Sequence, residues 1–126
     1  MGTKPIVEGA TRKDGWTIPP EILVVPGLDN GAGAEHPLFQ KKRIKLPVLE
    51  SLVESCIESG LIKSVAVFKA DNGDLEVIDG IQGVRAAREA NIRLTRQGSE
   101  KRVVCEISLK KGTPAQLRMM TIAANN

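Results

Sequence analysis

The chain of 126 residues has few aromatic side chains and few side chains that bind transition metals. Aromatic residues make up 2% of the sequence, as Trp16, Phe39 and Phe68, and tyrosine is absent. This excludes the stacked aromatic platforms with which many proteins bind single-stranded nucleic acid. The two cysteines, Cys56 and Cys105, form no CxxC or Cys/His pattern. One chain therefore holds neither a zinc site of sulfur and imidazole ligands nor a disulfide scaffold.

The only histidine, His36, lies in the glycine- and alanine-rich stretch GAGAEHP. A Ser-His-Asp triad is disfavoured there, because such triads need a rigidly held imidazole. No hydrophobic run approaches the roughly 20 residues of a membrane span. The N-terminal sequence MGTKPIVEGATRKDG also lacks the apolar centre of a signal peptide. We therefore expect a cytoplasmic protein with no membrane partner.

The charge is distributed unevenly along a chain whose hydrophobic and charged fractions, 41% and 26%, are those of a globular domain. Residues 1–80 hold 9 Lys/Arg against 12 Asp/Glu, a balance of −3, whereas residues 81–126 hold 9 against 3, a balance of +6. A basic half favours a polyanionic partner, either nucleic acid or the phosphates of a nucleotide, although a solvated basic surface has the same composition. A second, smaller basic cluster consists of Lys41, Lys42, Arg43 and Lys45.

The first 20 residues are polar and contain three prolines, which predicts a flexible arm over 1–20 before one domain over 21–126. Trp16 and Ile18 are candidates to fix the end of this arm to the domain. The short apolar run Ile22–Val25 ends at Pro26-Gly27 and predicts an edge strand or a docking segment. Residues 27–37 are expected to form a flexible loop.

The clearest periodicity predicts a helix with Pro47 in its first turn and Gly60 at its C-terminal end. Cys56 lies on its apolar stripe and is interpreted as a core residue. The stripe consists of Leu49, Leu52, Val53, Cys56 and Ile57.

The remaining elements are predicted from turn signals and alternation. A hairpin of residues 65–68 and 75–78 surrounds the turn at Asn72-Gly73. A helix follows from about Gln82 to Ala90, then a half-buried strand over 103–109. In the final helix Thr113 is the N-cap and Pro114 the first residue, with Leu117, Met120 and Thr121 facing inward. The predicted fold class is α+β, a small mixed sheet with flanking helices.

The junction between the second hairpin strand and the next helix is the expected site. Gly80 and Gly83 let the backbone approach an anion, and the N–H groups at the helix start attract it. Arg85 and Arg88 could add charge-assisted hydrogen bonds to phosphate oxygens. The alternative is a tight turn with solvated arginines.

Four stretches of this sequence resemble the N-terminal domain of the ParB/sulfiredoxin superfamily, especially short ParB-like proteins of phages and plasmids, over His36 to Asn125. They are HPLFQKKRIKLP, LVESCIESGLIKSVAVFK, LEVIDGIQGVRAAREAN, and VVCEI followed by TIAANN. In the family, the turn that matches Asp79-Gly80 grips the triphosphate of a nucleotide, CTP in chromosome-segregation ParB and ATP in some relatives. The resemblance implies CTP or ATP with Mg²⁺ as ligand.

Carried over by position, Arg85 matches the second arginine of the family's turn, Arg43 falls in an upstream motif that lines the pocket, and Asn125 begins a motif that contacts phosphate and metal. The implied nucleotide-binding residues are Asp79, Gly80, Ile81, Gln82, Gly83, Arg85, Arg43 and Asn125. Two positions depart from the family: Gly83 replaces the first arginine, and the residue after Gly80 is the apolar Ile81. The catalytic cysteine of sulfiredoxin is also absent, so sulfinic-acid reductase activity is not expected.

The leading hypothesis is a nucleotide-binding, DNA-associated ParB-like domain that self-associates, for example as a homodimer, and could hydrolyse the nucleotide. The residues expected to face nucleic acid are Arg88, Arg93, Arg96, Lys101, Arg102, Lys110 and Lys111. One alternative is a metal-dependent DNA nuclease, for which Asp79 is the candidate metal ligand. Another is a degenerate domain that binds a protein, in which Ile81 and Gly83 mark a site released from its ancestral ligand.

Overall fold

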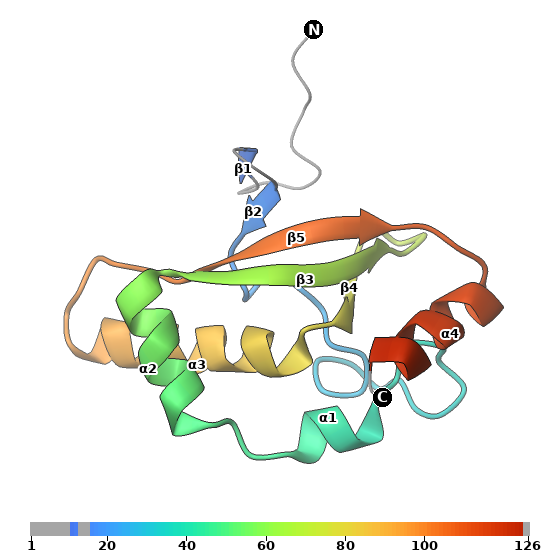
Figure 1. Cartoon of the computed structure of the whole chain (residues 1–126), viewed down its shortest axis with the longest axis horizontal. Helices are drawn as coiled ribbons and strands as arrows, with labels where there is room; N and C mark the ends of the chain where they lie inside the picture. The colour runs from blue at the N-terminus through green and yellow to red at the C-terminus, as the bar shows by residue number, and fades with distance from the viewer. Residues whose placement is uncertain (1–10, 13–15, 125–126) are drawn as a thin grey trace, which may run out of the picture.

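A computed structural model describes residues 11–12 and 16–124 of the chain and shows a sheet with helices packed along it (Figure 1). The elements are β1 (Thr11–Arg12), β2 (Trp16–Ile18), α1 (Lys41–Lys45), α2 (Glu50–Ser59), β3 (Leu61–Lys69), β4 (Leu75–Asp79), α3 (Ile81–Arg96), β5 (Val104–Lys110) and α4 (Pro114–Ala124). None of the helices in this part of the chain has both the length and the apolar character needed to cross a membrane.

The sheet has the strand order β1-β2-β5-β3-β4. Its central strand, β3, pairs parallel with β5 and antiparallel with β4, and β2 pairs antiparallel with β5. The predicted fold class, a mixed sheet with flanking helices, is therefore confirmed. Ile18 is fully buried opposite Cys105 and Trp16 packs partly against the core, as expected for residues that fix this end of the N-terminal segment. Residues 1–10 and 13–15 of the expected arm lie outside the described residues.

Two hydrophobic clusters use alternate residues of β3. Val65 and Val67 are fully buried in the larger cluster, which also holds the inner residues of α2 and α3. Ala66 and Phe68 pack against a smaller cluster of Leu38, Ile78 and Leu117, which includes a residue of α4. Successive residues of a strand point to opposite sides, so β3 joins the two clusters.

The helix predicted around Cys56 is α2, but it begins later than expected. It starts at Glu50, so Pro47 precedes the helix, and Leu49 is 66% exposed because it stands at the N-cap position. Cys56 is fully buried, and this burial raises the pKa of its thiol, which confirms it as a core residue. Gly60 ends α2 in the left-handed conformation (φ 74°), as predicted.

The next helix, α3, extends six residues beyond the predicted end at Ala90. The extension is stabilised by burial, because Asn91 and Leu94 continue the inner face of the helix. Asn91 also donates to the carbonyl of Val103 and accepts from its N–H (3.1 and 2.7 Å), which fixes the start of β5 beside α3. The amide nitrogen and the amide oxygen of Asn91 thus satisfy the buried carbonyl and N–H groups of Val103.

The segment Ile22–Val25 docks on the edge of the sheet, one of the two predicted alternatives. Val24 donates its N–H to the carbonyl of Leu75 (2.8 Å) and accepts from the N–H of Val77 (2.9 Å), which gives a parallel bridge to β4. Leu23 and Val25 are buried. The segment therefore covers an edge of β4 that would otherwise expose unpaired backbone groups.

Ser64 is held in the left-handed region (φ 65°) at an irregularity of β3 between Ile62 and Val65. A glycine there avoids the strain of a side chain, so Ser64→Gly is expected to raise the free energy of unfolding by about 1 kcal/mol. The neighbouring Lys63→Gly, at a residue that does not have a positive φ, is expected to lower it by about 0.5–1 kcal/mol. Urea denaturation measures both, and a loss of stability in Ser64→Gly would contradict the strain.

Candidate functional site

The junction between β4 and α3 has the backbone that the sequence predicted. Gly80 stands at the N-cap of α3 with φ 99°, and no side chain caps the helix there. Asp79, the last residue of β4, is exposed. The first N–H groups of a helix have no partner within it and attract anions. The start of α3 therefore has the geometry of an anion-binding turn.

Ile81 and Gly83 have packing roles that explain why they differ from charged residues. Ile81 is 2% exposed and belongs to the main hydrophobic cluster, so its side chain faces away from any ligand at the turn. A Cβ on Gly83 would lie 2.9 Å from Cγ2 of Ile62. The first turn of α3 thus lies tightly against β3. Both residues are explained without a lost ligand, which removes the observation that favoured the degenerate-domain alternative.

Three residues predicted to bind nucleotide lie together in one hydrogen-bond network. Nη1 of Arg85 donates to the carbonyls of Arg43 (2.9 Å) and Leu46 (2.5 Å) and to Oε1 of Gln82 (3.0 Å). This network connects the start of α3 with the end of α1. Asn125, also predicted from the resemblance, lies outside the described residues.

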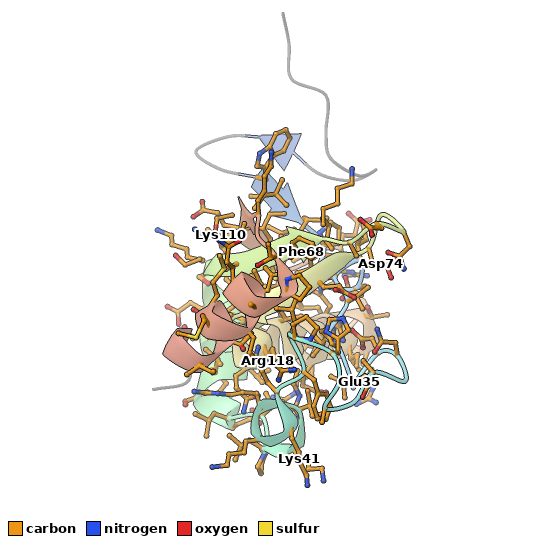
Figure 2. All side chains as sticks on the ribbon, turned by 90° about the vertical axis from the view of Figure 1, so that its right-hand side faces the viewer. Glu35, Lys41, Phe68, Asp74, Lys110 and Arg118 are labelled. Carbon is orange, nitrogen blue, oxygen red and sulfur yellow. The ribbon has the colours of Figure 1, made fainter. Side chains whose placement is uncertain are left out.

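A cavity of about 570 Å³ opens between α1 and α4. Figure 2 shows Lys41 on α1 and Arg118 on α4, which belong to its two sides. Its lining combines basic and apolar side chains. The lining residues are Phe39, Gln40, Lys41, Lys42, Arg43, Leu46, Arg118, Thr121 and Ile122. Sequence reasoning identified the basic cluster of α1 but missed the contribution of α4, whose signal is a single arginine in an otherwise uncharged helix.

Side-chain bonds to backbone carbonyls fix the walls of this cavity. Gln40, which is buried, donates to the carbonyl of Ile78 in β4 (2.6 Å). Arg118 donates to the carbonyls of Ala34 and His36, each at 3.0 Å. The loop before α1 is thereby attached to both β4 and α4. The cavity consequently depends on contacts between segments far apart in sequence.

Two of the seven residues expected to face nucleic acid form ion pairs within the chain. Arg88 pairs with Asp29 (2.8 Å); burial raises the pKa of Asp29, but hydrogen bonds from Arg88 and from the N–H of Val25 outweigh it and the pKa is lowered. Arg93 pairs with Glu50 and Glu89, and the pKa of Glu50 is lowered by the hydrogen bond from Arg93. These two arginines are engaged with carboxylates of the chain itself.

The other five of these residues are exposed but do not form one surface. Arg96, Lys101 and Arg102 lie around the connection from α3 to β5, whereas Lys110 ends β5 and Lys111 follows it (Figure 1). The length of β5 separates the two groups.

The described residues contain no group of three or more His, Cys, Asp and Glu side chains that could hold a metal ion. Within the described part of the chain, Asp79, the candidate metal ligand of a nuclease, therefore does not belong to a group of side chains that could hold a metal ion. His36 lies between the N–H of Leu38, which donates to its Nδ1 (3.0 Å), and the Glu76 carboxylate, which is 3.2 Å from its Nε2. Both ring nitrogens are engaged in local contacts.

By sequence, no model of a known protein family matches the chain, and no curated protein matches it either. By structure, the chain is similar to the C-terminally truncated chromosome-partitioning protein ParB from Caulobacter crescentus complexed with CTP-gamma-S, with a TM-score of 0.52 and 21% sequence identity. The chain has a ParB-like fold. The match covers 86% of this chain and 51% of the other, so the chain spans about half the length of that protein. The CTP analogue belongs to the Caulobacter protein.

Substitution of Gly80 tests the backbone of the turn between β4 and α3. Gly80→Ala is expected to lower the free energy of unfolding by about 1–2 kcal/mol, because a left-handed backbone disfavours a side chain. The added Cβ would also lie 3.3 Å from Cγ2 and 3.4 Å from Cα of Val65. Gly73→Ala is a matched control, since Gly73 has φ 92° and nothing within 4 Å of an added Cβ. Denaturant unfolding that shows an equal or smaller loss for Gly80→Ala would contradict the close approach to Val65.

Proposed function

We propose that the chain binds a nucleoside triphosphate, CTP or ATP with Mg²⁺, with the phosphates between the first turn of α3 and the basic residues of α1. The observation that carries the proposal is the cavity of about 570 Å³ whose lining includes Lys41, Lys42, Arg43 and Arg118. Of the described residues predicted to bind nucleotide, Arg43 alone belongs to this lining, and the turn at the start of α3 reaches it through Arg85, which donates to the carbonyls of Arg43 and Leu46. Its volume lies within the roughly 300–1,000 Å³ of ligand pockets. Charge-assisted hydrogen bonds from lysine and arginine are the strong contacts of phosphate groups.

The apolar part of the same lining suits the other end of a nucleotide. Phe39, Leu46 and Ile122 contribute hydrophobic surface, and Thr121 a hydroxyl group. Ligand pockets commonly combine such surface with a few polar groups that fix orientation. The ParB-like fold, known with CTP-gamma-S in the Caulobacter protein, supports this ligand class. Magnesium in such complexes is held by phosphates and one or two carboxylates, for which exposed Asp79 is the candidate in this turn.

Isothermal titration with CTP, ATP and GTP, each with Mg²⁺, tests the proposal. We expect binding of at least one nucleotide, weakened roughly 10–100-fold in Lys41→Ala/Lys42→Ala by the loss of two charged hydrogen bonds. The control Lys110→Ala/Lys111→Ala changes the net charge equally, and Lys110 lies far from Lys41 (Figure 2). It is expected to leave the affinity within about twofold, because salt screens distant exposed charges. Absence of binding, or equal losses in both pairs, would contradict the proposal.

Association with DNA is a further part of the proposed function, together with self-association of the domain. It rests on Arg96, Lys101 and Arg102, which are exposed around one connection, whereas Arg88 and Arg93 are paired internally. Clustered cations bind the phosphate backbone by releasing counterions. This contact would be independent of DNA sequence.

The salt dependence of DNA binding tests this surface. Fluorescence anisotropy of a labelled duplex, measured over a range of salt concentrations, gives the slope of log K against log[salt]. In Arg96→Ala/Lys101→Ala/Arg102→Ala the slope is expected to become shallower by about 2–3, since each phosphate that the protein no longer neutralises changes it by about 0.9. Lys110→Ala/Lys111→Ala serves as the control at the other end of β5. An equal change in both variants would indicate that general charge, and not this surface, binds DNA.

A further inference from the structure

The short helix α1 carries three basic residues of the proposed site but cannot hold its own position. It has five residues, none of them buried. Isolated helices of this length are unstable in water, since one turn fixes several backbone angles for few hydrogen bonds. The position of Lys41 and Lys42 at the cavity therefore depends on contacts that other elements make with α1.

The C-terminal end of α1 also has a backbone acceptor that the helix cannot satisfy. In an α-helix the carbonyl of Arg43 would accept from the N–H of residue 47, but residue 47 is proline and has no N–H. The backbone turns away after α1, since Leu46 at its C-cap is extended (ψ 142°). Two backbone carbonyls, of Arg43 and Leu46, are thereby left to donors from outside the helix.

Arg85 supplies this donor. Its Nη1 lies 2.9 Å from the Arg43 carbonyl and 2.5 Å from the Leu46 carbonyl. A cation at a helix C-terminus is also favoured by the helix dipole. Oε1 of Gln82, one turn earlier on α3, accepts from the same nitrogen (3.0 Å) and orients the guanidinium toward α1. The arginine that the resemblance assigned to phosphate is thus engaged with the protein backbone.

We propose that Arg85 is a positioning residue, which holds α1 and its lysines at the cavity by donating to the carbonyl of Arg43, for which Pro47 offers no helical N–H, and to the carbonyl of Leu46 at the C-cap. The part of this inference that concerns nucleotide binding rests on the proposed function. The role of Arg85 in placing α1 does not depend on it. It predicts that the basic wall of the cavity is lost when Arg85 is removed, even before any nucleotide is added.

Nuclear magnetic resonance of the ligand-free protein tests this role directly. In Arg85→Ala we expect the Cα chemical shifts of residues 41–45 to lose their helical displacement. The amide protons of Ile44 and Leu46, which donate to the carbonyls of Gln40 and Lys42, are expected to exchange about tenfold faster or more. Arg85→Lys retains a donor without the planar fork and is expected to give an intermediate result. Arg96→Ala, which removes an exposed arginine from the same helix, is the control and is expected to change neither signal.

Unchanged shifts and exchange in Arg85→Ala would overturn the inference, whether or not a nucleotide binds. Exchange that rises equally throughout β3 and α3 would also overturn it, because the effect would then be a general loss of stability. A lack of nucleotide binding by the unmodified chain would remove the proposed ligand and leave the α1 result to stand by itself.

Where a nucleotide binds, a double-mutant cycle with Lys42→Ala separates positioning from direct contact. If Arg85 only places α1, Arg85→Ala already displaces Lys42. The double variant should then bind within about twofold of Arg85→Ala alone. Losses that multiply would mean that Arg85 acts on the phosphates independently, and would overturn the positioning role.

Discussion

The structure depends on arginine side chains that bind the backbone of a long connection with little regular structure of its own. Residues 19–49, between β2 and α2, contain only the five-residue α1 as a regular element. Their buried carbonyl groups must find donors elsewhere in the chain. Arg88 donates to the carbonyls of Pro20 and Leu23, Arg118 to those of Ala34 and His36, and Arg85 to those of Arg43 and Leu46. Hydrogen bonds that involve a charged group contribute about 1.5–3 kcal/mol each. The bonds to Leu46 and Ala34 are exposed and the other four are partly buried, so the partly buried bonds contribute most to the position of the connection.

Part of the uneven charge of the sequence is used within the fold. The acidic first part supplies Asp29 and Glu50, and the basic second part supplies the arginines that pair with them. Part of the balance of +6 after residue 80 is therefore neutralised inside the fold. A sequence count treats each arginine as available to a polyanion, whereas Arg88 and Arg93 are partners of carboxylates. Whether a basic side chain is exposed, and whether it already pairs with a carboxylate, determines if it can bind a ligand; the number of basic residues in the sequence does not.

Elements set by neighbouring residues could be predicted from the sequence, whereas the cavity could not. The hairpin around Gly73, the left-handed end of α2 at Gly60 and the start of α4 at Pro114 depend on local backbone preferences and were predicted correctly. The turn expected at Gly80, between a strand and a helix, follows from the same kind of reasoning. The meeting of α1 and α4 depends on contacts between residues such as His36 and Arg118, which are 82 positions apart. Periodicity carries no information at that separation, so the role of α4 was missed.

The hydrogen bonds that hold the loop before α1 in place also keep the two walls of the cavity together. The cavity has one wall from α1 and one from α4, and the loop before α1 lies in place because Gln40 and Arg118 hold it. Among the described residues, the main buried cluster of the sheet does not include residues of α1 or α4. If the proposed nucleotide bridges both walls of the cavity, by mass action it stabilises the arrangement in which these bonds are formed. Hydrogen bonds that fix these walls, from Gln40 and Arg85 among others, would therefore influence the affinity of the proposed nucleotide together with the lysines of the lining.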